Sequence, residues 1–118
     1  MPRFVILTHD HPSLHWDFML EAQSALRTWR LSAALVVSKH IQAELLPDHR
    51  LHYLDYEGPV SKNRGTVTRW DAGTFTWIMD EPLLLKVYLQ GKRIRGICLL
   101  KRNIADNFWT CQIEDEVE

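Results

Sequence analysis

Short runs of alternating apolar and polar residues make up most of the chain. β-Branched and aromatic residues are frequent in these runs and turn residues separate them, which is typical of an all-β sandwich or barrel. The runs that predict strands are Arg3–Thr8, Ser13–Glu21, Leu51–Tyr56, Gly65–Trp70, Thr74–Ile78, Leu83–Leu89, Arg93–Leu100 and Asn107–Ile113. The segments Asp71–Gly73 and Gln90–Lys92 predict hairpin turns, because glycine allows the positive φ of tight loops. Such short turns predict antiparallel neighbours.

The segment 22–46 gives conflicting signals. Its alanine, leucine, glutamine and glutamate residues favour helix, whereas Thr28, Trp29 and the pair Val36-Val37 favour strand. Ser38 could cap one or two helical turns over residues 39–43. The expected fold class is therefore mainly all-β, with one short helix or helical turn.

Aromatic and β-branched residues of the strand-like runs are predicted to form the core, since they suit half-buried pleated surfaces. The residues expected to be mostly buried are Trp16, Phe18, Trp29, Val67, Trp77, Val87, Ile94, Cys98 and Trp109.

The run from residue 14 to residue 20 carries the first candidate chemistry. In a strand, its even-numbered apolar side chains face one side, while His15, Asp17 and Met19 face the other. Residues two apart on a strand are separated by about 6.6 Å, so His15 and Asp17 could both reach one metal ion.

A third metal ligand is expected from the end of the preceding strand, where His9 lies across a short turn. His11, within that turn, could replace it. Two imidazoles and a carboxylate leave coordination positions open, which suits a catalytic divalent metal better than a closed structural site. The alternative is a hydrogen-bonded His–Asp pair without metal, since six histidines in 118 residues can meet by chance.

Composition places the chain among ordinary globular proteins and predicts one domain over residues 1–118. The net charge of −1 gives no support to a general nucleic-acid binder, although a local basic groove remains open. The apolar runs are far shorter than a membrane span and the first residues do not form a signal peptide, so we expect a cytoplasmic protein with no membrane partner. Cys98 and Cys111 stand alone in their runs and are expected to be reduced structural thiols.

Two polar segments follow later in the chain. Residues 48–58 could be a loop that enters an aromatic strand, with ordinary hydrogen bonds for its histidines and tyrosines. The loop Ser61–Gly65 is cationic and could meet a phosphate through Lys62 and Arg64, although a solvated loop has the same composition. Glycine-rich phosphate-binding motifs are absent from the sequence, which argues against nucleoside triphosphate chemistry.

Taken in order along the chain, these segments resemble a known family. The segments are His9-Asp10, the run 14–21 (LHWDFMLE, similar to the pattern LHxDFRLE), Asp48-His49, Asp55-Tyr56-Glu57-Gly58, and Gly65-Thr66-Val67 with Trp70-Asp71. They resemble the 3′-phosphoesterase domain found at the N-terminus of bacterial DNA ligase D and as a stand-alone protein. The resemblance covers nearly the whole chain.

The resemblance implies a small closed antiparallel β-barrel with its active site on an outer concave face. It implies hydrolysis at the 3′ ends of nucleic acid, either DNA or an RNA–DNA primer-template, with a ligase or end-joining protein as partner. Manganese is the implied ion, with zinc or cobalt as alternatives. The implied metal ligands are His9, His15 and Asp17, and the implied catalytic residues are His49 and Tyr53.

Three positions depart from the family pattern. Met19 replaces an arginine, Leu7 a glutamine and Pro47 a glutamate. Either Lys62 and Arg64 supply the phosphate contacts instead, or the activity has changed. Arginine restored at position 19 is expected to strengthen phosphate binding without disturbing the core. The competing function is a non-catalytic barrel that binds nucleic-acid ends or a repair partner, and a third is hydrolysis of a small phosphorylated metabolite.

Overall fold

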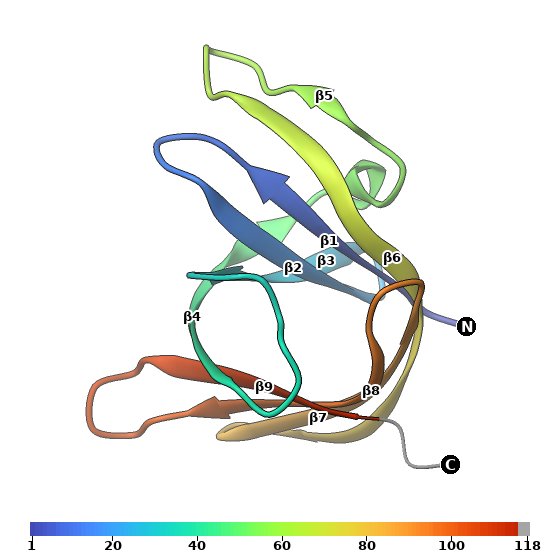
Figure 1. Ribbon diagram of the computed structural model, residues 1–118, viewed down its shortest axis with the longest axis vertical. Helices are drawn as coiled ribbons and strands as arrows, with labels where there is room; N and C mark the ends of the chain where they lie inside the picture. Colours follow the sequence, from blue (N-terminus) through green and yellow to red (C-terminus); the bar gives the residue numbers. More distant parts are fainter. Residues whose placement is uncertain (116–118) are drawn as a thin grey trace.

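A computed structural model describes residues 1–115, in which nine strands form one antiparallel sheet and one short 3₁₀ helix packs on it (Figure 1). The elements are β1 (Arg3–His9), β2 (His15–Ala22), β3 (Ala25–Leu31), β4 (His40–His49), η1 (Leu51–Leu54), β5 (Gly58–Pro59), β6 (Thr66–Glu81), β7 (Leu84–Gly91), β8 (Arg95–Arg102) and β9 (Trp109–Asp115).

The sheet closes on itself, which confirms the predicted closed antiparallel barrel. Its strand order is β1-β2-β3-β4-β9-β8-β7-β6-β5, and the additional pairing of β1 with β6 completes the ring. The long strand β6 runs from the top to the bottom of the view in Figure 1. Register shifts in its pairing with β1 and with β7 accompany this change of neighbours, since bulges bend a strand.

Alternating residues divide the apolar side chains into two clusters. The inner cluster receives residues from β1 to β4 and from β6 to β9, so it fills the barrel, and Trp29 and Phe18 are among its largest members. The outer cluster comes from β1, β2, β3 and β6 and is covered by η1; it contains Val5, Leu7, Met19, Leu26, Leu54 and Val67. Phe18 lies inside and Met19 outside, as strand alternation predicts.

The predicted strand Leu51–Tyr56 is wrong, because this segment forms the helix η1. Leu51 and Leu54 are three residues apart, which matches the 3.0 residues per turn of a 3₁₀ helix and places both side chains on the outer cluster. Leu54 is buried there. A run of aromatic and apolar residues favours strand locally, but here an apolar surface on the barrel selects one helical turn.

The predicted hairpin turn at Asp71–Gly73 is also wrong, because these residues lie inside β6. The Asp71 carboxylate is buried and accepts hydrogen bonds from the backbone N–H groups of Lys92, Arg93 and Ile94, at 2.8–3.1 Å. Asp71 therefore holds the turn between β7 and β8. The turn predicted at Gln90–Lys92 begins slightly later, because Gln90 and Gly91 end β7. A Cβ atom on Gly91 would overlap the Asp71 carboxylate.

Residues 22–46 are mostly strand, so the helical turn predicted after Ser38 is wrong. Ser38 lies in a turn with a φ of 69°, and its backbone N–H donates to the carbonyl of Ile113 at 3.0 Å. The strands β3 and β4 pair with each other, with β2 and with β9. Hydrogen bonds to neighbouring strands therefore satisfy the backbone N–H and C=O groups of this segment, although its residues have conflicting secondary-structure propensities.

The predicted core is largely confirmed. Phe18, Trp29, Val67, Val87, Ile94, Cys98 and Trp109 are buried, whereas Trp16 and Trp77 are only partly buried and pack against the inner cluster. Both cysteines are free and buried, as expected, with their Sγ atoms 3.5 Å apart. The hydrogen bond with Cys98, together with burial, raises the pKa of the Cys111 thiol. No helix within residues 1–115 is long and apolar enough to cross a membrane.

Candidate active site

The hairpin of β1 and β2 brings His9, His15 and Asp17 together. His9 and His15 are register partners, and Asp17 is two residues further along β2, on the same face as His15. One nitrogen or oxygen atom from each residue lies within 4.8 Å of the others. His11, the alternative to His9, is exposed in the connecting turn and outside this group.

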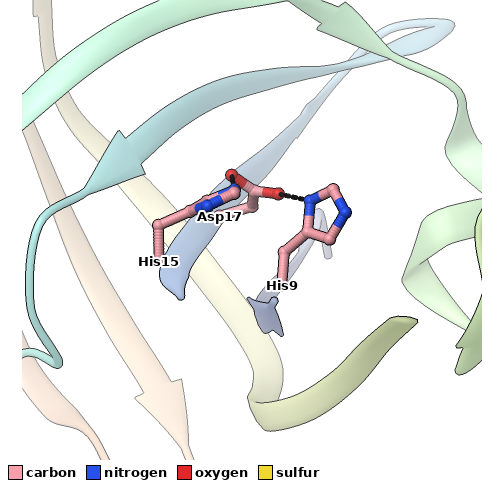
Figure 2. Close-up of side chains that lie close together, drawn as sticks. All are labelled: His9, His15 and Asp17. Carbon is pink, nitrogen blue, oxygen red and sulfur yellow. Dashed lines mark ion pairs between the residues drawn. The ribbon is translucent and has the colours of Figure 1, made fainter. Parts of the chain in front are cut away.

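The Asp17 carboxylate lies between the two imidazoles (Figure 2). Its Oδ2 is 3.4 Å from His9 Nδ1, and its Oδ1 is 3.2 Å from His15 Nε2. His15 and Asp17 are buried, whereas the His9 side chain is 17% exposed. One side of the group is therefore open to solvent.

Backbone carbonyls fix which nitrogen of each imidazole faces the carboxylate. His9 Nε2 lies 2.7 Å from the carbonyl of Arg64, and His15 Nδ1 lies 2.9 Å from the carbonyl of Ser13. A carbonyl only accepts, so each of these nitrogens carries a hydrogen. In a neutral ring the other nitrogen has a lone pair, and these two lone pairs face Asp17.

This donor set fits a divalent metal. Within the described part of the chain, the buried atoms His15 Nε2 and Asp17 Oδ1 have no hydrogen-bond partner. Two lone pairs and a carboxylate repel one another unless a cation lies between them, and unpartnered buried polar atoms are costly. Histidines that bind metals usually donate their other N–H to a carbonyl or carboxylate, as both do here. The alternative cation is a proton on one of the rings.

His49 and Tyr53 line a small cavity of about 70 Å³ together with His9 and Asp17. His49 ends β4, and Tyr53 lies on η1 with its ring centroid 5.8 Å from that of His49 in a T-shaped arrangement. His49 Nδ1 donates to the carbonyl of Pro47 at 2.9 Å, so Nε2 carries the lone pair when the ring is neutral. A backbone carbonyl at Pro47 thus orients this imidazole without the glutamate of the family pattern.

The two predicted phosphate-binding cations differ in position. Arg64 lines the same cavity, and its guanidinium donates to the backbone and side-chain oxygens of Ser61, at 2.9 and 3.1 Å. Lys62 is exposed in the turn before it, with a φ of 63°. It is outside the residues that line the cavity.

Met19 and Leu7 form an apolar floor beside the group of His9, His15 and Asp17. Both are buried in the outer cluster, with exposed fractions of 1% and 0%. The expectation that arginine could replace Met19 without disturbing the core is therefore wrong, because position 19 belongs to a packed cluster. The two departures from the family pattern occur together on neighbouring strands, so one apolar surface replaces two polar side chains.

Sequence reasoning missed Arg30, the register partner of Asp17 on β3. Its Nη1 is 3.9 Å from Glu44 Oε1, and its Nε is buried without a hydrogen-bond partner in the part of the chain described. Arg30 lies in the segment whose secondary structure was ambiguous. Only the pairing of β2 with β3 places it beside the site.

Comparison with known proteins identifies relatives over most of the chain. Residues 7–102 match the family described as the DNA ligase D 3′-phosphoesterase domain. The multifunctional non-homologous end joining protein LigD of Pseudomonas aeruginosa is 30% identical over 104 residues, which cover 80% of this chain and 12% of that protein. The multifunctional non-homologous end joining DNA repair protein LigD of Mycobacterium tuberculosis is 30% identical over 122 residues, which cover 96% of this chain and 16% of that protein. The chain thus spans less than one fifth of these relatives.

Proposed function

The chain belongs to the DNA ligase D 3′-phosphoesterase domain family, and we propose that it is a metal-dependent phosphoesterase that processes 3′ ends of nucleic acid in DNA repair. The resemblance found in its motifs is thereby confirmed as to family. The proposed reaction removes a 3′-terminal phosphate or ribonucleotide from DNA or from an RNA–DNA primer-template. The proposed ion is manganese, with zinc or cobalt as alternatives, and the names of the relatives favour a ligase or end-joining partner.

The observation that carries this proposal is the convergence of one nitrogen each of His9 and His15 on the buried Asp17 carboxylate, with the other ring nitrogens held by backbone carbonyls. The unpartnered buried atoms of this group call for a cation, and a cavity with a further histidine adjoins it. A divalent ion held there would polarise phosphoryl oxygens or activate a water molecule. Because the Asp17 carboxylate is buried beside the apolar floor, little solvent reaches it to stabilise its negative charge.

His49 is proposed to act on the phosphoryl group from the other side of the cavity. With Nδ1–H held by the Pro47 carbonyl, its protonated Nε2 can donate to a phosphoryl oxygen or to the leaving 3′ oxygen. Tyr53 packs against the His49 ring and limits its orientation, and its hydroxyl can contact the substrate. Arg64 lines the cavity and can turn its guanidinium from Ser61 toward a phosphate.

The direct test is a primer-template with a labelled 3′-phosphorylated strand, and a second one with a 3′-terminal ribonucleotide. We expect the protein to release phosphate or the ribonucleotide with Mn²⁺, and a chelator to stop the release. His49→Asn should lower turnover by about 10²–10⁴-fold, the usual contribution of a positioned acid or base. His40→Asn is the matched control, since His40 is an exposed histidine at the opposite end of β4. Folded protein that releases nothing with any divalent ion contradicts the proposal.

A non-catalytic barrel that binds nucleic-acid ends is the second candidate, and the apolar floor of Leu7 and Met19 favours it. End-specific binding that survives in His15→Ala, with no turnover in either protein, would establish this alternative. Release from small phosphoesters but not from primer ends would instead indicate a metabolite substrate.

A further inference from the structure

A second and larger hollow adjoins the metal-ligating group of the proposed function, His9, His15 and Asp17, on the side of β3 and β4. Its volume is about 440 Å³, which is within the range of ligand pockets. His15 lines it and also belongs to the metal-ligating group, so the two sites share a residue. Arg30, Glu44, Leu14 and Phe108 lie along the same hollow, which we call the β3–β4 groove.

Arg30 is the cation of this groove. It faces the same side of the sheet as Asp17, because cross-strand partners share a face and their Cα atoms lie about 4.5–5.5 Å apart. Its Nε has no partner in residues 1–115, and its contact with Glu44 is a long one at 3.9 Å. The side chain is 40% exposed, so a ligand can reach it. A planar guanidinium with unused donors is suited to a phosphate.

Phe108 gives the groove an exposed aromatic ring. It lies just before β9, in the hairpin that connects β8 with β9, and it is 64% exposed. Leu14, at the start of β2, is 58% exposed along the same groove. Cationic grooves with aromatic side chains recur where proteins bind single nucleic-acid strands, because the cation binds the backbone and a base stacks on the ring.

We propose that the β3–β4 groove binds the 3′-terminal nucleotide of the substrate strand. Arg30 binds the 5′-phosphate of that nucleotide, its base stacks on Phe108, and its 3′-phosphate lies at His9, His15 and Asp17. This inference rests on the proposed function and adds the substrate subsite to it. Glu44 is then the group that Arg30 releases when the phosphate binds.

The test compares two ligands that differ only in the 5′-phosphate. They are a nucleoside 3′-phosphonate, whose carbon–phosphorus bond resists hydrolysis, and its 5′-phosphorylated form, each titrated calorimetrically with Mn²⁺ present. We expect the 5′-phosphate to tighten binding about tenfold or more in the natural protein. Arg30→Gln should remove that gain and leave the affinity for the 3′-phosphonate unchanged. Arg27→Gln is the matched control, because Arg27 is on β3, has the opposite strand parity and pairs with Asp80.

Variants of Glu44 and Phe108 separate binding from a structural role. Glu44→Gln frees Arg30 and should tighten the 5′-phosphorylated ligand about two- to fivefold, as expected for loss of an exposed charge partner. If the Arg30–Glu44 pair is purely structural, Arg30→Gln and Glu44→Gln would instead lower the melting temperature equally. Neither would then change the ratio of the affinities for the two ligands. Phe108→Ala should weaken both ligands about tenfold, whereas Phe108→Tyr should keep their affinities.

The outcomes separate this inference from the proposed function. If the 3′-phosphonate binds and the 5′-phosphate adds nothing, the subsite is wrong and the proposed function stands. If Arg30→Gln retains the gain, Arg30 is not the binding residue and the inference is overturned. If neither ligand binds the natural protein with Mn²⁺, both proposals are overturned.

Discussion

The outer face of the barrel has two halves that share the strands β1, β2 and β3 and differ in what covers them. The apolar half consists of Val5, Leu7, Met19, Leu26 and Val67. The polar half consists of His9, His15, Asp17, Arg30 and Glu44. The helix η1 covers the apolar half, whereas the β3–β4 groove adjoins the polar half. The small cavity lies between the two halves, because Met19 and Val67 line it together with His9 and Asp17.

The contrast shows how an apolar surface can increase the tendency of a neighbouring polar site to bind a cation. Asp17 pairs in register with Leu7 and precedes Met19 on the same face, so its carboxylate lies at the boundary of the two halves. Packed apolar neighbours lower the local polarity, which raises the free-energy cost of an unpaired charge. The apolar half should therefore increase the stabilisation that a cation bound beside Asp17 would give the folded protein.

The largest effect is expected from a charge placed in the apolar half. Met19→Arg should lower the free energy of unfolding by about 3–5 kcal/mol, because it buries an unpaired cation and disrupts packing. Met19→Leu is the control and should cost less than about 1.5 kcal/mol. Urea unfolding of the purified variants measures both values. A stable Met19→Arg protein with tighter phosphate binding would show that the two halves are one continuous site.

A smaller effect is expected from filling the polar half. Mn²⁺ at about 100 times its Kd should stabilise the folded protein by about 2.7 kcal/mol, because the ion binds only the folded state. Thermal unfolding with and without the ion measures this shift. Asp17→Asn should abolish it by removing the charged ligand, while His40→Asn should retain it. An equal shift in Asp17→Asn would mean that the ion binds elsewhere.

The smallest effect concerns the attachment of η1 over the apolar half. Asp55 follows η1, and the Arg3 guanidinium on β1 lies 2.6 Å from its carboxylate. Hydrogen bonding from Arg3, together with its positive charge, lowers the pKa of Asp55 below its ordinary value. The pair therefore stabilises the fold at neutral pH, and this contribution is lost as the pH falls through the lowered pKa.

Asp55→Asn should thus lower the melting temperature slightly at neutral pH and not at all once the natural carboxyl is protonated. Melting temperatures of the two proteins, measured from pH 7 down to below pH 3.8, follow this convergence. A difference that stays constant over the whole range would show that packing, not charge, holds η1 in place.

Local patterns were sufficient wherever neighbours in the chain are also neighbours in space. Alternation along residues 14–20 separated the core face from the face of His15 and Asp17, and a short hairpin placed His9 opposite them. The strand-like runs predicted an all-β sandwich or barrel, and the motifs, read in order, predicted the family, whose resemblance implied the closed barrel. The period of two along a strand predicts which side chains share one face of the sheet.

Long-range pairing decided what local patterns could not. Residues 51–54 became a helical turn because the outer cluster offered an apolar surface. Asp71 lies within β6, where its carboxylate holds the turn at residues 92–94. Arg30 lies opposite Asp17 only through the register between β2 and β3, and Phe108 lines the same groove as His15 only because the barrel closes. Side chains on different strands share a site only after the sheet has formed. The group of His9, His15 and Asp17 could therefore be predicted from one hairpin of the chain, whereas the groove beside it depends on the whole fold.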